Sequence, residues 1–408
     1  MLDMTQLWEW LSFAVRWAHV VAAIGWIGTS FYFIALDLGL RRHANLPEGV
    51  GGEEWQVHGG GFYHIQKYMV APDGLPGHLI WFKWESYATW LTGFAMLCVV
   101  YYAGADLYLI DRNVLDIEAP AAIALSIGSL AIGWIMYDLL CRSPIGRHDL
   151  ALMLLLYAVL VVIAWGYTQL FTGRAAFLHL GAFTATVMSA NVFMVIIPNQ
   201  KKVVTALKAG ETPDAHLGIQ AKQRSLHNNY LTLPVIFLML SNHYPLAFAS
   251  QYNWIIASLV FLMGVSIRHY FNSYYGKRSV LVWTWGVSLV LFGLIAWVST
   301  LGTPTSEEME EASRVSAYHQ RFQKHALFDN VVEIVNSRCS MCHAAEPLWE
   351  GIRVAPKGVK LETETEIATF AQEIYLQSGL SHAMPPGNIT ALEDRDRALI
   401  VKWYREAL

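Results

Sequence analysis

Long apolar runs, separated by short polar segments, fill the first three quarters of the chain. Eight runs reach the roughly 20 residues that a helix needs to cross a bilayer core. The second run opens with aromatic and charged residues and the sixth contains two prolines, so these two are the least regular. The pattern predicts membrane-spanning helices at 11–38, 80–102, 120–140, 149–171, 175–197, 230–249, 253–271 and 279–301.

The last quarter has the pattern of a water-soluble domain. Apolar positions recur at helical spacing within 325–338 and again within 391–407, as in helices that bury one face. A polar stretch separates this part from the last apolar run. We therefore predict an all-α chain, with an eight-helix membrane domain at 1–301, a linker at 302–321 and a small soluble domain at 322–408.

Composition supports this division. Hydrophobic residues make up 55% of the chain and charged residues only 15%, against about 25% charged in soluble domains. Residues 302–408 hold 27 of the 60 charged residues, which leaves the rest of the chain poor in charge. These values exclude a secreted soluble enzyme, a disulfide scaffold and a disordered protein. The net charge of −4 argues against a nucleic-acid partner.

Basic residues between the predicted spans indicate an orientation. The N-terminus lacks the basic segment of a cleavable signal peptide, so we expect the first span to direct insertion. With the N-terminus outside, the positive-inside rule is obeyed by thirteen side chains against two. Eight spans then place the soluble domain outside the cytoplasm as well. The inner set is Arg41, Arg42, Lys67, Arg142, Arg147, Lys201, Lys202, Lys208, Lys222, Arg224, Arg268, Lys277 and Arg278, and the outer set is Arg112 and Arg174.

The soluble domain contains the sequence CSMCH at 339–343. In c-type cytochromes, two such thiols bind the haem vinyl groups and the adjacent histidine becomes an iron ligand. A redox pair or a zinc site is the alternative, but zinc needs further ligands and this domain has no other cysteine. We therefore predict covalent haem c on Cys339, Cys342 and His343, in a class I cytochrome c domain. Because haem c is assembled outside the cytoplasm, this prediction agrees with the orientation.

The second axial ligand of the haem c iron is predicted to be Met384. It follows His343 by 41 residues and precedes two prolines that stiffen its loop. His382 is the rival ligand, whereas Met341 lies inside the attachment loop and is sterically excluded. Ligation by Met and His raises the reduction potential and suits an electron acceptor.

Three histidines, His19, His179 and His243, fall in the outer halves of the predicted spans. Ionisable residues at membrane depth are costly and indicate function. Imidazole is also the usual ligand of b-type haem between helices. His19 and His179 lie at similar depth in spans that enter from the same side, so we predict them as the axial pair of a b-type haem, with His243 in reserve. The alternative is that these histidines line a substrate pocket.

Several stretches resemble the membrane-bound urate oxidase family, bacterial proteins in which an eight-span domain is fused to a C-terminal cytochrome c. They are WAHVVAAIGWIG at 17–28, WFKWESY at 81–87, HNNYLTLP at 227–234 and SNHYP at 241–245. The similarity covers essentially the whole chain, including the order of its domains.

The resemblance implies that urate is oxidised to 5-hydroxyisourate in the bacterial inner membrane. The electrons would leave through haem c to a respiratory cytochrome c or terminal oxidase, without direct peroxide formation. Both termini would lie in the periplasm. A fused haem suits this chemistry, because a two-electron oxidation of a purine needs a one-electron outlet.

Urate is a planar monoanion at neutral pH, so its site is expected to combine aromatic surfaces, a cation and amide groups. Four predicted site residues supply such groups on the inner side: Lys83, Glu85, His227 and Asn228. Lys83 would balance the anion, and Glu85 or a histidine would accept a proton. The alternative for Lys83 is that it anchors the second span at the membrane interface.

Three other functions compete with urate oxidation. A membrane-anchored electron-transfer cytochrome subunit of a respiratory complex would need only a few spans. A quinol dehydrogenase or terminal oxidase subunit would carry paired histidines for copper, and this chain has no such pair. A transporter would have an internal repeat, and none is found.

Overall fold

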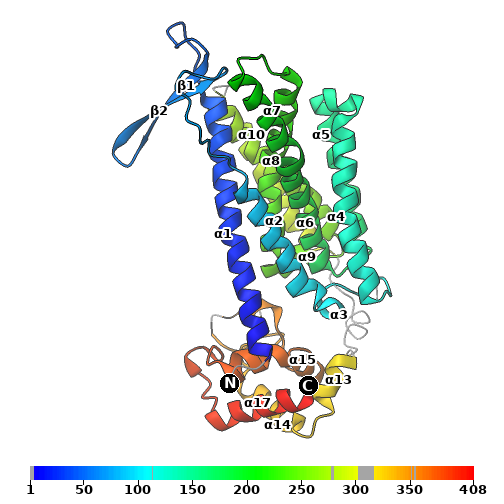
Figure 1. Ribbon diagram of the computed structural model, residues 1–408. Helices are drawn as coiled ribbons and strands as arrows, with labels where there is room; N and C mark the ends of the chain where they lie inside the picture. The colour runs from blue at the N-terminus through cyan, green and yellow to red at the C-terminus, as the bar shows by residue number, and fades with distance from the viewer. Residues whose placement is uncertain (1–3, 113, 277–279, 302–316, 351, 353–354) are drawn as a thin grey trace. The chain divides into compact units, whose positions relative to one another are not determined.

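The fold is overwhelmingly helical and divides into two compact units (Figure 1). The computed structural model describes residues 4–112, 114–276, 280–301, 317–350, 352 and 355–408. The N-terminal unit is Met1–Gly302 and the C-terminal unit is Thr303–Leu408, and each has its own hydrophobic core. Most of the predicted linker, residues 302–316, lies outside the described residues.

Long helices running side by side build the N-terminal unit (Figure 1). Two of them contain π-helical turns, Leu97–Tyr102 after α2 and Asn191–Ile196 between α6 and α7. The helices are α1 Met4–Gly39, α2 Trp84–Met96, α3 Ala105–Tyr108, α4 Ala119–Arg142, α5 Asp149–Thr168, α6 Gly173–Ala190, α7 Ile197–Lys208, α8 Ala215–Leu240, α9 Pro245–Phe248, α10 Asn253–Tyr275 and α11 Trp283–Ser299.

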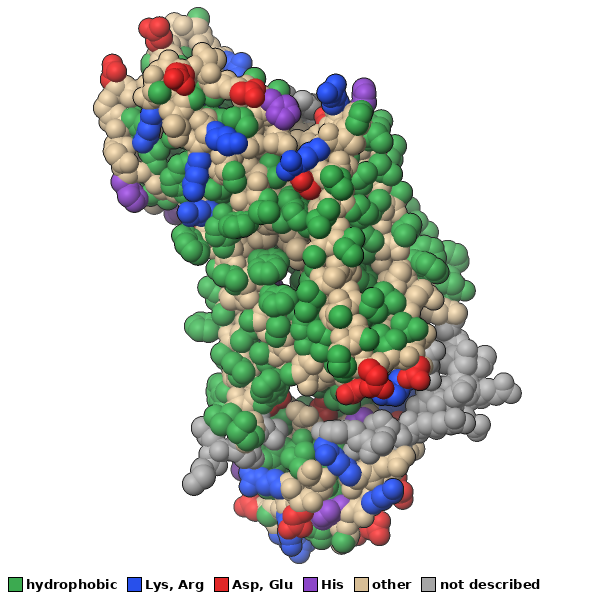
Figure 2. Space-filling model, turned by 45° about the vertical axis from the view of Figure 1, so that its right-hand side comes forward, with side chains coloured by type: hydrophobic (Ala, Val, Ile, Leu, Met, Phe, Trp, Pro, Cys, Tyr) green, Lys and Arg blue, Asp and Glu red, His purple; other side chains and the backbone are tan. Residues whose placement is uncertain are grey.

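Helix α6 lies at the centre of the bundle, and the peripheral helices expose apolar side chains. In the apolar 18-residue stretch of the segment Gly173–Lys208, 67% is buried. The corresponding share is 17% in α5 and 6% in α1. Hydrophobic side chains cover the flank of the bundle, and Lys and Arg side chains gather at the end that carries the β hairpin (Figure 2). An apolar surface of this extent is compatible with a lipid surrounding.

Within the described residues, five helices are long and apolar enough to cross a membrane, by length and composition. They are Gln6–Gly39, Ala119–Arg142, Asp149–Thr168, Gly173–Lys208 and Asn253–Tyr275. The second, sixth and eighth predicted spans are also helical, as α2, α8 and α11, but they do not meet that criterion. The count of eight spans therefore stays a prediction.

The sixth predicted segment, 230–249, differs from the structure at both ends. Helix α8 begins at Ala215, where the Asp214 side chain accepts a hydrogen bond from the amide of His216 at 2.9 Å. It ends at Leu240, where a 3₁₀ turn at Ser241–His243 follows, and Pro245 disfavours the helical conformation at the preceding Tyr244. Polar residues at 215–229 hid the start of this helix from the hydropathy pattern.

A β hairpin between α1 and α2 was not predicted from the sequence. Its strands are β1 Val50–His58 and β2 Gly61–Tyr68, joined by Gly59 and Gly60, which both have positive φ. Such a turn matches the right-handed twist of the strands and needs glycine. The glycine-rich sequence reads as a loop, so the alternation within the strands was missed.

Glu53 in this hairpin is expected to titrate far below an ordinary carboxyl group. Hydrogen bonds from His43, His64 and Gln66 lower its pKa from 4.5 to about 2. Because the folded-state pKa is depressed, these contacts stabilise the hairpin above about pH 4.5, and that stability is lost as the pH falls towards 2. Carbon-detected NMR of the Glu53 carboxyl group in the full chain measures the midpoint. A midpoint near 4.5 would contradict the assignment.

The C-terminal unit is a small helical domain around an aromatic core. Trp403 and Ile400 of the last helix are fully buried, and Trp403 Nε1 donates to the Phe322 carbonyl at 3.1 Å. Two helices lie where the sequence predicts them, at 328–338 and 394–407. The helices are α13 Ala317–Gln323, α14 Phe328–Arg338, α15 Glu364–Thr369, α16 Ala371–Ile374 and α17 Asp394–Ala407, with a π-helical turn at Tyr375–Leu380.

Candidate functional site

Three consecutive residues of α8 direct their side chains into three different parts of the N-terminal unit. Successive helical residues point about 100° apart, so neighbours in sequence reach different helices. His227 contacts Tyr137 of α4, Asn228 contacts Asn191 at the π-helical turn, and Asn229 contacts α10. All three are buried. Burying a polar side chain in an apolar bundle is destabilising unless the side chain has a hydrogen-bond partner. Each of the three contacts therefore marks a polar site inside the bundle.

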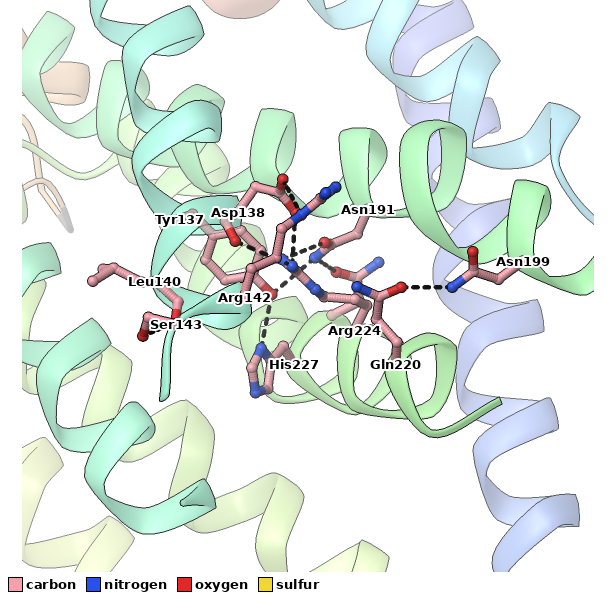
Figure 3. A network of polar contacts seen from close by, with 11 residues as sticks. Tyr137, Asp138, Leu140, Arg142, Ser143, Asn191, Asn199, Gln220, Arg224 and His227 are labelled. Carbon is pink, nitrogen blue, oxygen red and sulfur yellow. Dashed lines mark hydrogen bonds and ion pairs between the residues drawn. The ribbon is translucent and has the colours of Figure 1, made fainter. Parts of the chain in front are cut away.

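The His227 network fixes the protonation of its imidazole (Figure 3). The Asn191 amide oxygen accepts from Arg224, so its nitrogen donates to the Tyr137 hydroxyl at 3.1 Å. Tyr137 then has His227 Nδ1, at 2.7 Å, as the acceptor for its own proton. A neutral His227 therefore carries its proton on Nε2, which has no hydrogen-bond partner in the described part of the chain. A π-helical turn beginning at Asn191 aims that amide into the network.

An ion pair anchors the same network. Arg224 is fully buried and its Nη2 lies 2.7 Å from Asp138 Oδ1. The other oxygen of Asp138 is 2.7 Å from Nε of the exposed Arg142 (Figure 3). Among the described residues, Asp138 is therefore the only carboxylate paired with Arg224, whereas Asp138 has two cations. The ion pair ties α4 to α8 inside the bundle.

A small pocket lies beside His227. Its other lining residues are almost all apolar, among them Leu156, Phe183 and Phe261. The pocket thus offers one ring N–H in apolar surroundings. That chemistry suits an apolar ligand better than urate, whose edge is polar all round.

The other predicted urate-site residues lie apart from His227. Asn228 has both amide atoms engaged, since its oxygen accepts from Asn191 at 2.9 Å and its nitrogen donates to the Met188 carbonyl at 2.9 Å. Lys83 lies over the ring of Trp84 at the start of α2. Glu85 Oε2 is buried without a hydrogen-bond partner among the described residues. No hydrogen bond or ion pair joins Lys83 or Glu85 to His227 in the described part of the chain.

His19 has the arrangement expected of a haem ligand. Its Nδ1 lies 3.0 Å from the Thr89 carbonyl, which can only accept, so Nε2 keeps its lone pair. The His19 ring packs closely against Gly93 of α2. A Cβ at that position would lie only 2.9 Å from His19 Cε1, so the glycine leaves room for the ring. His19 lines a small, mostly apolar pocket between α1, α2 and α6.

The other two predicted b-haem ligands are placed differently. His179 is fully buried, with Nδ1 donating to the Ala175 carbonyl at 2.7 Å and Nε2 2.7 Å from the Ser126 hydroxyl. Both ring nitrogens are thus occupied, and His179 does not line the pocket of His19. His243 is exposed on a short turn after α8. The structure brings neither residue to His19.

In the C-terminal unit, the CSMCH sequence closes α14 in a geometry that fits haem attachment. Cys339 caps the helix, and the His343 amide bonds back to the Cys339 carbonyl at 3.0 Å. His343 Nδ1 donates to the Val359 carbonyl at 2.8 Å, which fixes the orientation of the ring and leaves the lone pair of Nε2 for a metal ion. This donor set fits the proximal side of a haem iron.

The surroundings of the two thiols disfavour their thiolate forms. Burial raises the pKa of the Cys339 thiol to about 11, and burial also raises the pKa of Cys342. Redox CxxC pairs instead have a thiol of depressed pKa that forms a reactive thiolate. Among the described residues, moreover, no three His, Cys, Asp or Glu side chains group closely enough to hold a metal ion.

The buried guanidinium of Arg397 holds the loop of Met384. Its Nη1 donates to the carbonyls of Ser378 at 2.6 Å and Met384 at 3.0 Å, and Nη2 donates to Asn388 Oδ1 at 3.2 Å. Met384 is half-buried, whereas His382 is exposed. A ligand on the haem must face the interior of the domain, so this geometry favours Met384.

Sequence reasoning missed the buried arginines. It placed Arg224 and Arg268 in connections between spans, and this is wrong, because both lie inside helices and are buried. A lysine or arginine near a span end ordinarily reaches the interface, so composition alone gives no sign of burial. The only available signal was the neighbouring polar residues at helical spacing. Lys277 and Arg278 lie outside the described residues.

Comparison with known proteins identifies the family of the N-terminal unit. A family model described as urate oxidase N-terminal matches residues 5–299, more than two thirds of the chain. No curated protein and no solved structure matches. The match indicates an oxidoreductase that acts on urate. The chain therefore belongs to the urate oxidase N-terminal family.

Proposed function

We propose that this chain is a membrane urate oxidoreductase that forms 5-hydroxyisourate and delivers two electrons through covalent haem c to the respiratory chain. One observation carries the proposal. The same chain contains both the urate oxidase N-terminal match at 5–299 and the CSMCH sequence typical of haem attachment at 339–343. Urate and water yield 5-hydroxyisourate, two protons and two electrons. Haem c, once attached, supplies a one-electron outlet.

The protein's own groups have separate tasks in this proposal. Cys339 and Cys342 hold the haem covalently, while His343 and Met384 are its axial ligands. Glu85 is the proposed proton acceptor, because its buried Oε2 has no hydrogen-bond partner among the described residues. His227 and Asn228 position α8, and Lys83 anchors α2 at the interface. The rival function is an electron-transfer subunit without its own catalytic site. It would leave the urate oxidase N-terminal match at 5–299 unexplained.

A b-type haem in the pocket of His19 is part of the proposal. His19 Nε2 is free for iron, whereas His179 would first have to give up its hydrogen bond with Ser126. Such a haem would supply an electron relay within the membrane. A pyridine haemochrome assay of the purified chain tests for it, and detection of haem c alone would end this part of the proposal.

The test of the respiratory route uses membranes that contain the chain. Urate consumption should require oxygen in the absence of other acceptors, should stop when cyanide blocks the terminal oxidase, and should form no peroxide. Added soluble cytochrome c should restore urate consumption in the presence of cyanide. Urate loss that is insensitive to cyanide and accompanied by peroxide would overturn the proposal.

Replacing Met384 by Ala is expected to abolish the weak sulfur-to-iron charge-transfer band and to lower the reduction potential of haem c. The reason is that a thioether stabilises ferrous iron relative to ferric iron. Optical redox titration of the full chain measures both effects. The matched variant His382→Ala should leave band and potential unchanged. The reverse pattern would make His382 the ligand.

We also propose that the chain lies in a bacterial inner membrane with both termini in the periplasm. Lys and Arg side chains gather around the hairpin end of the N-terminal unit, as expected of a cytoplasmic face (Figure 2). A reporter that is active only in the cytoplasm, fused after Leu408, should therefore be silent. The same reporter inserted between Gly59 and Gly60 should be active. Activity after Leu408 would contradict the orientation.

A further inference from the structure

Arg268 is a buried cation inside an apolar helix. It lies seven residues before the end of α10, about 10 Å along the helix axis, and only 5% of its surface is exposed. An arginine removed from water is strongly destabilising unless an anion or several hydrogen bonds compensate it. The groups around Arg268 therefore show which compensating contacts the protein itself provides and which contacts a bound ligand would have to provide.

Within the described ranges, the partners of Arg268 are all neutral. The guanidinium lies 4.0 Å from the centre of the Phe31 ring, Nη2 donates to Asn272 Oδ1 at 3.1 Å, and Nε donates to Asn229 Oδ1 at 3.4 Å. Among the described residues no carboxylate forms an ion pair with it, and its Nη1 has no hydrogen-bond partner. Arg224, by contrast, lies 2.7 Å from the carboxylate of Asp138.

Asn229 adds a second unpaired donor to the same cluster. Its oxygen accepts from Arg268 and, at 2.9 Å, from Asn272 Nδ2, which fixes the orientation of the amide. Its Nδ2 is buried and has no hydrogen-bond partner within the described ranges. The cluster thus has a net positive charge and spare N–H donors, and the described residues supply no acceptor for those donors. A buried donor without an acceptor is destabilising, because it has lost its hydrogen bonds to water without gaining another.

We propose that Arg268, Asn229 and Asn272 bind the purine monoanion, with Phe31 holding the guanidinium in place. This inference rests on the proposed function and names the residues that recognise urate. An anion with several oxygen and nitrogen acceptors along a planar edge matches the free Nη1 of Arg268 and Nδ2 of Asn229. A lipid phosphate is the other anion available in a membrane, but headgroups lie beyond the helix ends, and Arg268 lies about two turns inside α10.

The decisive variant is Asn229→Asp, which places a built-in anion beside Arg268 without changing the shape of the side chain. If the cluster binds urate, this carboxylate should occupy the cation and weaken urate binding by at least about 30-fold. The same ion pair should raise the thermal stability of the chain. The matched control, Asn253→Asp, adds a buried carboxylate at the first residue of the same helix and should leave urate affinity unchanged.

Equilibrium dialysis of radiolabelled urate against the haem-loaded full chain in lipid nanodiscs measures the affinity. Arg268→Gln should weaken binding by a similar factor. If Asn229→Asp is more stable but binds urate as the wild type does, Arg268 is only structural and the inference fails, while the proposed function stands. A fall in tightly bound lipid phosphorus with unchanged urate affinity would also overturn it, in favour of a lipid. If the wild type neither binds nor oxidises urate, the proposed function itself fails.

Discussion

A chain in which Cys339 and Cys342 are both replaced by serine is expected to lose its covalent haem and all urate-driven reduction of cytochrome c. Serine hydroxyls do not add to the haem vinyl groups, so only the proposed axial ligands, His343 and Met384, would retain the porphyrin. Haem-dependent peroxidase staining of a denaturing gel measures covalent attachment, and stopped-flow spectroscopy measures the electron output. Both signals should fall to background.

The control for this variant is urate binding, which belongs to the N-terminal unit in this account. The double serine variant should bind urate with wild-type affinity in the same nanodiscs. A matched control, Cys98→Ser and Cys141→Ser in the N-terminal unit, should keep its haem c. Wild-type rates of cytochrome c reduction by the Cys339 and Cys342 variant would show that haem c is not the outlet.

Asp138→Asn is expected to destabilise the N-terminal unit by about 3–5 kcal/mol, because it leaves the fully buried Arg224 without a counter-ion. Arg224→Met should cost less, since Asp138 keeps its 2.7 Å contact with the exposed Arg142. The combined variant, Asp138→Asn with Arg224→Met, should recover much of the loss, because no unpaired charge remains.

Thermal unfolding of the full chain in a fixed detergent ranks these variants. Asp138→Asn should have the lowest apparent melting temperature, and the double variant should lie above it. A control at an exposed pair, Asp37 with Lys67, should change little, because both side chains are about half exposed. Equal effects of Asp138→Asn and Asp37→Asn would contradict the buried ion pair.

Much of the helical architecture could be predicted from the sequence, because an apolar run of about 20 residues indicates a membrane-spanning helix. The helix at 119–142 was found within about two residues of its ends. Helix α8 was not, because its first half carries buried polar residues that a hydropathy window scores as loop. The hairpin at 50–68 was missed for the opposite reason, since its glycines obscure the strand alternation.

The two candidate sites differed in how far the sequence could describe them. Haem attachment is a prediction from a local pattern, so Cys339, Cys342 and His343 could be named without a structure. Urate recognition depends on which buried charges lack partners, and that is a property of packing. Lys83 was favoured as the cation because it lies beside aromatic residues, whereas Arg268 was assigned to a connection. Only the structure distinguishes the two buried arginines. Arg224 pairs with the carboxylate of Asp138, whereas Arg268 contacts the neutral amide of Asn229.

Anaerobic titration of the purified, oxidised chain with urate tests the central claim most directly. Each urate consumed should reduce two haem c centres, seen as growth of the ferrous α-band, and should form one 5-hydroxyisourate. Any b-type haem would be counted separately by its own band. Two equivalents of ferrous haem per urate, without oxygen, are what this account predicts. Disappearance of the urate absorbance while haem c stays ferric would contradict it.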